Sequence, residues 1–354
     1  MSGKSILTRV ICCIKKTLTK VICLNLEIVT TPNENLKETG FGTLKACHNF
    51  LSAVKKLGYN ARLNICAKEE DLQKIVERRP DLVVLAVKYL KVKEKPNLWL
   101  SDYFSGNEVN YTGSTREVLR FDSDKVLAKE HLRAKGIRTA EYFTTLPGQY
   151  RFAEELPLAF PLFLKPIDAA NGNGIDDSSY VTNFEEFKSK VSSLHESYGS
   201  PVLVEKYLMG REFTSSIARA KNDELIVSTV ELIPPLSENG IRILGMKTKS
   251  EDTEKIRKTD KSLLVKNVSK LAVSAFTNLN VRDFGRIDIK TDQQGQCYFM
   301  EANLVPGMTY GSSYFPKSFE IEKGISYENV VQLILEGAVS RIPKFNITCA
   351  HSAN

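Results

Sequence analysis

The stretch FGRIDIKTDQQGQCYFMEAN, residues 284–303, contains two segments in which apolar and polar residues alternate, separated by a short polar turn. This alternation is typical of a β-hairpin that has one face against a core. A turn centred on Gln293 and Gln294 sets the pairing of the two strands. In this register we expect Arg286 to lie across from Glu301.

The same register sorts the hairpin residues onto two faces. One face carries an arginine and three residues with side-chain oxygen atoms, namely Arg286, Asp288, Glu301 and Asn303. The other face carries apolar residues that we expect to enter a core, namely Ile287, Ile289, Met300 and Ala302. Asp288 lies across from Phe299, so its Cα is about 7–8 Å from the Cα of Glu301 on the diagonal.

Two carboxylates and an amide oxygen on one face suit a hard metal ion. Mg²⁺ binds oxygen ligands and usually keeps substrate phosphates in its coordination shell. The Pro306-Gly307 pair, shortly after Asn303, predicts a chain reversal that opens the backbone beside this face. The alternative is a solvated sheet surface on which these residues form salt bridges.

The whole chain has the composition of a soluble globular protein. Its 354 residues, 42% hydrophobic and 26% charged, are too many for one ordinary core and predict two or three domains. No apolar run reaches the roughly 20 residues that span a bilayer. The net charge of +7 is mild, and a polyanionic small molecule such as a nucleotide explains it as well as nucleic acid does.

The cysteines and histidines predict no metal or disulfide framework. The seven Cys form no CxxC pair, and the four His lie far apart. We expect Cys12, Cys13, Cys23 and Cys66 to be small buried hydrophobes in a reducing, cytoplasmic compartment. Residues 1–20 have no acid and carry apolar residues at helical spacing. They predict a basic amphipathic helix that packs on its own protein, stays disordered or lies on a membrane surface.

The first third of the chain predicts a parallel sheet. Strand-like and helix-like segments alternate as strand 20–31, helix 42–58, strand 60–66, helix 69–80 and strand 81–89. Such alternation is typical of strands joined by crossover helices. A turn at 111–114 and a helix at 124–136 follow.

The remainder predicts two further α/β units. The first has apolar strands at 161–166 and 201–208, a Gly/Asn loop at 168–175 and a helix at 183–199. The second has antiparallel strands at 211–220, 224–233 and 241–250, a mobile charged loop at 247–262, a helix at 264–280 and the hairpin. We therefore expect an N-terminal extension, three domains and a tail, with boundaries at 1–19, 20–118, 119–207, 208–340 and 341–354.

Four motifs in this order carry a family resemblance. They are YTGS followed by DKVLAK, then FPLFLKP, then VLVEKYLMGREFT, and last RIDIK with FMEANLVPGMT. Between about residue 110 and residue 318 the chain resembles the ATP-grasp superfamily, and within it D-alanine–D-alanine ligase. The resemblance implies a three-domain ATP-grasp fold, α/β with an α+β C-terminal part, in which two domains sandwich ATP.

The resemblance also implies roles for single residues. ATP would be bound by Lys125, Lys165, Glu205, Lys206, Tyr207, Leu208, Glu212 and Lys249, with Lys247 as an alternative to Lys249. The ligands of two Mg²⁺ ions, for which Mn²⁺ could substitute, would be Asp288, Glu301 and Asn303. The catalytic groups would be Arg286 and the Gly307 amide at the oxyanion, and Ser312. Substrate residues would be Glu38 or Glu34, Asn171, Tyr310 and Ser313.

The implied activity is ATP-dependent joining of a carboxylate to an amine through an acyl phosphate. Several positions depart from the family pattern, because the loop after Lys165 contains Ala170, Asn171 and Gly172, and Ser250 stands where the family has Tyr. The alternatives are the same chemistry on a specialised metabolite or peptide, and a nucleotide-binding relic without turnover. The expected partners are small amino-acid or carboxylate substrates, with no nucleic acid, and both a monomer and a homodimer are compatible with the sequence.

Overall fold

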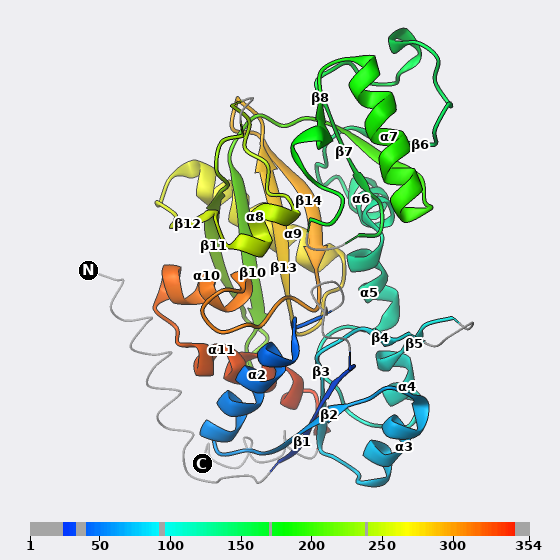
Figure 1. The fold of residues 1–354 in the computed structure, drawn as a ribbon. Helices are drawn as coiled ribbons and strands as arrows, with labels where there is room; N and C mark the ends of the chain where they lie inside the picture. The colour runs from blue at the N-terminus through cyan, green and yellow to red at the C-terminus, as the bar shows by residue number, and fades with distance from the viewer. Residues whose placement is uncertain (1–23, 33–39, 92–95, 170–171, 238–239, 344–354) are drawn as a thin grey trace.

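The computed structural model describes residues 24–32, 40–91, 96–169, 172–237 and 240–343. A parallel three-stranded sheet with the order β2-β1-β3 forms its N-terminal part. Its elements are β1 (Asn25–Thr30), α2 (Leu44–Lys56), β2 (Asn60–Ile65), α3 (Glu69–Glu77) and β3 (Leu82–Leu85). The predicted β-α-β-α-β alternation is confirmed, and Figure 1 shows this sheet at the lower end of the molecule.

A short connecting region leads out of this sheet. It consists of β4 (Tyr89–Leu90), β5 (Leu98–Trp99), α4 (Leu100–Gly106), α5 (Arg116–Ser123) and α6 (Lys125–Ala134). Asp124 caps the N-terminus of α6, and its side chain accepts a hydrogen bond from the backbone N–H of Leu127. This cap fixes where the helix starts and therefore where the lysines of its first two turns lie.

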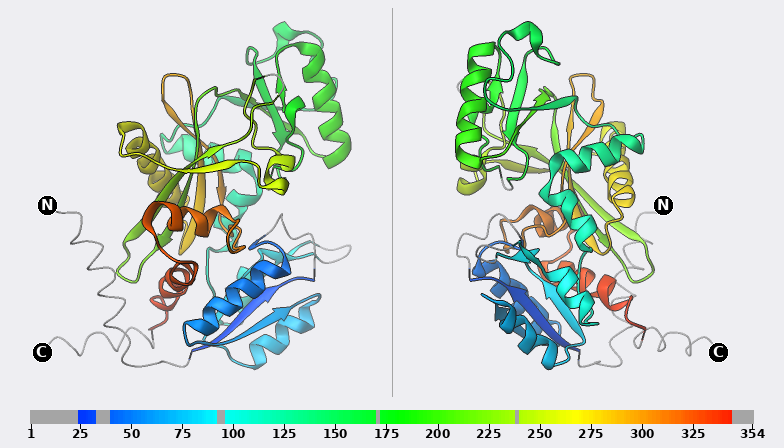
Figure 2. Two further views of the ribbon diagram at one scale, coloured as in Figure 1. Left: turned by 60° about the vertical axis from the view of Figure 1, so that its left-hand side comes forward. Right: turned by 90° about the vertical axis from the view of Figure 1, so that its right-hand side faces the viewer.

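A four-stranded antiparallel sheet with the order β6-β9-β7-β8 follows. Its elements are β6 (Tyr142–Thr145), β7 (Leu162–Pro166), β8 (Tyr180–Val181), α7 (Phe184–Tyr198) and β9 (Val202–Lys206). Helix α7 packs on β7, β8 and β9 around a small apolar cluster that includes Leu164, Phe187 and Val204. Figures 1 and 2 show this unit at the end of the molecule opposite the parallel sheet.

A five-stranded antiparallel sheet with the order β12-β11-β10-β13-β14 occupies the middle. Its strands are β10 (Glu212–Arg219), β11 (Leu225–Ile233), β12 (Lys255–Lys258), β13 (Phe284–Thr291) and β14 (Cys297–Asn303). The helices of this region are α8 (Met246–Glu251), α9 (Leu263–Asn278), α10 (Tyr314–Lys323) and α11 (Tyr327–Val339). Helices α9 and α10 both pack on the sheet, and α11 packs on α2 of the N-terminal unit.

Two sequence predictions in this region are wrong. Residues 241–250 do not form a third long strand, because α8 occupies 246–251. Residues 247–262 are not a structureless loop, since β12 pairs with β11 through Val230–Lys258 and Ile233–Lys255. The sequence prediction missed β12 because this strand consists mostly of charged residues. Exposed lysines are common in strands that lie at the edge of a sheet, as β12 does.

The predicted register of the β13–β14 hairpin is also wrong. Asp288 lies directly across from Glu301, and Arg286 lies across from Asn303. Gly295, at φ 78°, adds one residue to the turn, and a bulge between Asp288 and Ile289 adds a second shift. Each irregularity moves the pairing of the two strands by one residue, so together they move it by two. Because side chains alternate with a period of two, the predicted polar face is kept.

The second shift changes one member of the apolar face. Phe299 is fully buried in the core, whereas Met300 at the bulge is half-buried and lies outside the core cluster. Ile287, Ile289 and Ala302 are buried as predicted. Among the described residues, no helix combines the length and apolar character that crossing a membrane requires. The predicted N-terminal amphipathic helix, with Cys12, Cys13 and Cys23, lies outside the described residues.

Candidate active site

The polar face of β13 and β14 is organised around Asp288. Its carboxylate accepts hydrogen bonds from Arg286 Nε and Nη2, both at 3.0 Å, from Thr214 Oγ1 at 2.6 Å and from Asn303 Nδ2 at 3.1 Å. The ring of Tyr314 lies 5.2 Å from the Arg286 guanidinium. Because Asn303 donates through its nitrogen, its amide oxygen stays available to a cation.

Glu301 lies beside this network and is surrounded by cations. Its Oε2 is 3.9 Å from Lys125 Nζ. Burial opposes ionisation, but the charges of Lys125, Lys249, Lys165 and Arg286 outweigh it and hold the pKa of Glu301 at about 2. Glu301 is therefore anionic at neutral pH, although Arg286 also pairs with Asp288 and Lys165 also pairs with Glu205.

Lys125 connects α6 to the loop that follows β7. Its Nζ donates to the carbonyl oxygens of Ile167 and Ala169. It is buried, and burial lowers its pKa below the usual value for lysine. The residue thus lies between the glycine-bearing loop and Glu301, and its role as a phosphate-binding lysine stays a prediction.

Lys165 and Glu205 meet on neighbouring strands of the four-stranded sheet. Lys165 Nζ is 2.7 Å from Glu205 Oε2, and Lys129 Nζ on α6 is 2.5 Å from Oε1. These cations outweigh the effect of burial and lower the pKa of Glu205 to about 2. The sequence prediction missed Lys129, although its spacing of four residues from Lys125 places both on one face of α6.

The chain between Lys206 and Glu212 leaves the four-stranded sheet and enters β10. The Lys206 side chain is 61% exposed, and its backbone N–H donates to the Glu141 carbonyl at 2.9 Å, so a ligand contact through its backbone stays a prediction. Leu208 is buried, and the Tyr207 ring packs on Tyr180 at 4.7 Å. Lys290, which the sequence prediction missed, lies 5.1 Å from the Tyr207 ring and 3.4 Å from Glu212.

Helix α8 and the loop after it cover the site. The backbone at Gly245 and Met246 approaches the glycine-bearing loop so closely that a Cβ on Gly172 would lie 3.0 Å from Gly245. Met246 N–H donates to the Ile175 carbonyl at 3.1 Å. Lys249 is the α8 lysine whose charge lowers the pKa of Glu301. Further on, Glu254 accepts a hydrogen bond from the hydroxyl of Tyr314.

The segment after β14 brings Gly307 and Ser313 together. A Cβ on Gly307 would lie 2.8 Å from Ser313 Oγ, and that oxygen accepts a hydrogen bond from the N–H of Thr309 at 2.9 Å. Ser312 lies in the turn before α10, where its N–H donates to the Thr309 carbonyl. Of the two serines that the sequence left ambiguous, Ser313 is therefore the one that faces Gly307.

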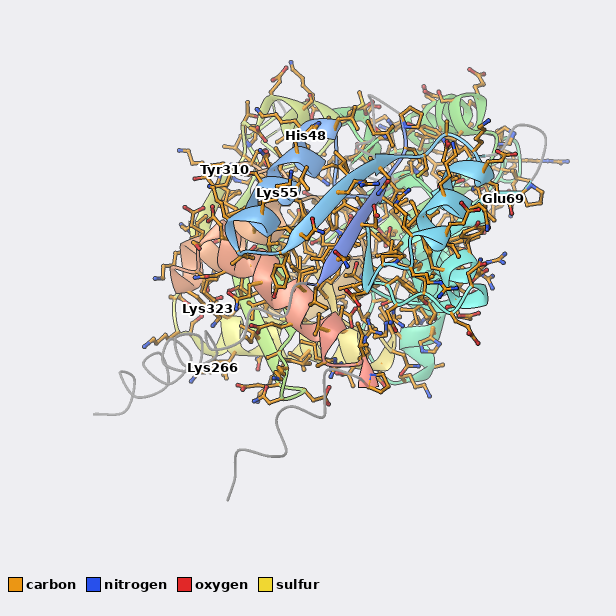
Figure 3. The ribbon with its side chains drawn as sticks, turned by 90° about the horizontal axis from the view of Figure 1, so that it is seen from below. His48, Lys55, Glu69, Lys266, Tyr310 and Lys323 are labelled. Carbon is orange, nitrogen blue, oxygen red and sulfur yellow. The ribbon has the colours of Figure 1, made fainter. Side chains whose placement is uncertain are left out.

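Tyr310 lies at the junction with the N-terminal unit. Its backbone N–H donates to Asn49 Oδ1 on α2 at 3.2 Å, and Figure 3 shows it near His48 and Lys55 of that helix. It is exposed, with its ring edge against Tyr327. The remaining predicted substrate residues, Glu38 or Glu34 and Asn171, lie outside the described residues.

Comparison with known proteins identifies the family of the chain. The family model described as D-ala D-ala ligase C-terminus matches residues 132–336. The chain belongs to this ligase family. It is 29% identical over 297 residues to the D-alanine–D-alanine ligase of Thermotoga maritima, covering 84% of this chain and 92% of that protein. Against the enzyme of Aquifex aeolicus it is 26% identical, covering 83% and 94%.

Solved structures of the ligase family share the fold. The D-alanine–D-alanine ligase of Bacillus anthracis complexed with ATP superposes with a TM-score of 0.69 at 20% identity, covering 91% of this chain and 99% of that one. The ligase of Coxiella burnetii gives 0.66 at 17%, covering 92% and 97%. The predicted ATP-grasp fold is confirmed, and the chain is an ATP-dependent ligase that forms C–N bonds. The predicted domain boundaries stay a prediction.

Proposed function

We propose that the protein uses ATP to join the carboxylate of an amino acid, or of a related small acid, to an amine. The observation that carries this proposal is the Glu301 carboxylate among the charges of Lys125, Lys165, Lys249 and Arg286, on the same face as Asp288. The relatives' names specify D-alanine, which makes D-alanine the first substrate to test here.

The donor set fits a magnesium ion in type, since Asp288, Glu301 and the Asn303 amide supply oxygen ligands only. Both oxygens of Asp288 already accept two hydrogen bonds each, which fills the roughly four acceptor positions of a carboxylate. An ion at Asp288 must therefore displace a donor. When bound, two such ions, or Mn²⁺ in their place, would neutralise phosphate charge.

The lysines of the site suit the nucleotide. Lys125, Lys165 and Lys249 would hold its phosphates, and the backbone of Lys206 and Leu208 would face the edge of the base. Tyr207 would lie against the base, and Glu212 would accept from the ribose hydroxyls. Glu205, whose oxygens can accept hydrogen bonds, would take the amino group of adenine.

The reaction would proceed in two transfers. A substrate carboxylate oxygen attacks the γ-phosphorus, ADP leaves, and an acyl phosphate forms. The amine then attacks the acyl carbon, phosphate leaves with the bonding electron pair, and the proton that the amine loses is taken up by the departing phosphate. Arg286 and the Gly307 N–H would stabilise the oxyanion formed in this second attack. Helix α8 would exclude water, and Tyr310, Ser312, Ser313, Asn171 and Glu38 are proposed to line the substrate end.

The experiment is a panel of D- and L-amino acids, alone and in pairs, incubated with ATP and Mg²⁺. We expect phosphate release that depends on the amino acids, together with an amide product found by mass spectrometry. Failure of every substrate to stimulate phosphate release above the ATP-only rate would contradict the proposal. A product that contains a peptide or a specialised acid would keep the chemistry and change the substrate class.

Two further assignments stay predictions. A cytoplasmic location suits the described thiols, because Cys47, Cys66 and Cys297 are free and buried. A homodimer is expected by resemblance to the family. Sedimentation of the purified protein tests the second assignment directly.

A further inference from the structure

The Glu205 carboxylate has one cation more than its own charge requires. Lys129 and Lys165 each form an ion pair with it, at 2.5 and 2.7 Å, and all three side chains are at least 95% buried. One carboxylate balances one lysine. The second buried ammonium adds a net positive charge in a low-dielectric region, which is unfavourable unless another anion meets it.

The two lysines differ in where they can act. The charges of both lysines interact with Glu301, but Lys165 also interacts with Glu212 at the start of β10, and it is the less completely buried of the two. Lys129 is fully buried on α6, with its ammonium 5.8 Å from the ring of Tyr142. Burial lowers the pKa of Lys129, as expected for a cation with no access to solvent. Of the two lysines, Lys165 is therefore the one that can leave Glu205 and pair with a second anion.

We infer that Lys129 is a positioning residue that balances Glu205, so that Lys165 can leave this carboxylate for a phosphate of the bound nucleotide. The inference rests on the proposed function, because it requires ATP as the ligand. Lys129 itself touches Glu205 and not the nucleotide. The ammonium of Lys165, which Glu205 does not need for charge balance in the nucleotide-free protein, then pairs with the phosphate.

Removal of Lys129 has a specific consequence. Lys165 then becomes the single partner of Glu205, and its departure would leave a buried carboxylate unpaired. Breaking a buried pair in this way is strongly unfavourable. This unfavourable free energy weakens the binding of ATP. Binding of adenosine, which has no phosphate, leaves Lys165 in place and avoids it.

The experiment compares ATP and adenosine affinity by calorimetry in the full-length protein. We expect Lys129→Met to weaken ATP binding by at least about tenfold, about 1.4 kcal/mol, and to change adenosine binding by less than about twofold. Lys129→Arg keeps the charge and should retain ATP binding. Lys135→Met, on the exposed end of α6, is the matched control. Equal losses for both ligands, or unchanged ATP binding in Lys129→Met, would overturn the inference.

A double variant covers the case in which Lys129→Met fails to fold. Glu205→Gln removes the carboxylate, so no unpaired negative charge remains when Lys165 moves to the phosphate. ATP affinity of the Glu205→Gln/Lys129→Met protein should then lie within about twofold of Glu205→Gln alone. A further tenfold loss in the double variant would mean that Lys129 binds the nucleotide directly. Absence of ATP binding in the parent protein would instead refute the proposed function.

Discussion

Arg286 is held by the residue that is expected to bind metal. Two of its guanidinium nitrogens donate to Asp288, so the third, Nη1, is the one left to face a substrate oxygen. A cation that displaced this pair would free more of the guanidinium. Metal binding and the availability of Arg286 are thus expected to be coupled through one carboxylate.

Replacement of Arg286 tests its role at the oxyanion. Arg286→Ala should lose amide formation by about 10²-fold or more, the scale for removal of an oxyanion donor, and should keep ATP binding. Arg286→Lys should stay impaired, because a lysine cannot reproduce the planar fork. Product formation and nucleotide affinity of both variants are measured together. A fully active Lys variant would show that only the charge of Arg286 matters.

Replacement of Glu301 tests its assignment as a metal ligand. Glu301→Gln keeps the shape of the side chain and removes its charge, so turnover should fall to background across a Mg²⁺ titration. The fold should stay intact, as measured by circular dichroism. Glu320→Gln, on the exposed side of α10, serves as the control. Phosphate release near the parent rate at ordinary Mg²⁺ would refute the assignment of Glu301.

The β13–β14 hairpin separates what the sequence could predict from what it could not. Alternation alone placed Arg286, Asp288, Glu301 and Asn303 on one face, because this depends only on a period of two. Which residues lie opposite one another depends on turn length and bulges. Gly295 was a visible signal for a longer turn, whereas nothing local marks Met300 as a bulge.

The covering segment, α8 with the loop to β12, is joined to the catalytic face through Tyr314. The hydroxyl of Tyr314 bonds Glu254 of this segment, and its ring lies against Arg286. Tyr314→Phe removes the bond and keeps the ring, so the segment should open more often and admit water. We expect more phosphate released per amide formed. Tyr298→Phe, whose hydroxyl bonds Asp292 in the hairpin turn, is the control. An unchanged ratio would show that Tyr314 does not hold the cover.

At the scale of the whole molecule, ATP should stabilise the native state. Binding to the folded protein alone raises the melting temperature by mass action, so a thermal scan with ATP and Mg²⁺ should shift upward. Lys165→Ala should reduce this shift strongly. No shift in the parent protein at millimolar ATP would contradict nucleotide binding altogether.

Acid should destabilise the molecule through Glu205 and Glu301. Glu205 and Glu301 have pKa values of about 2 in the fold, below the ordinary 4.5. A lowered pKa means that their stabilisation is complete above pH 4.5 and is lost as the pH falls toward 2. Urea unfolding between pH 2 and 6 should show this slope, and Glu205→Gln should flatten it. An equally steep slope in the variant would exclude Glu205 as a source.

The order of the elements was predictable along most of the chain because helices and strands here follow clear periods of apolar residues. The arrangement of the lysines around the site was only partly predictable. Lys125, Lys165 and Lys249 follow motifs, but Lys129 and Lys290 depend on which strand a helix crosses and which strand lies beside β10. Such contacts join residues far apart in sequence, where no local pattern records them.

The two irregularities of the hairpin also show where its length can vary. Deletion of Gly295 alone would shorten the turn to two residues and leave every pair of β13 and β14 in place. Deletion of Met300 alone would remove the bulge and likewise keep the faces of both strands. We therefore expect related chains to lack either residue without loss of the site, whereas a single-residue gap elsewhere in β14 would move side chains between the catalytic face and the core.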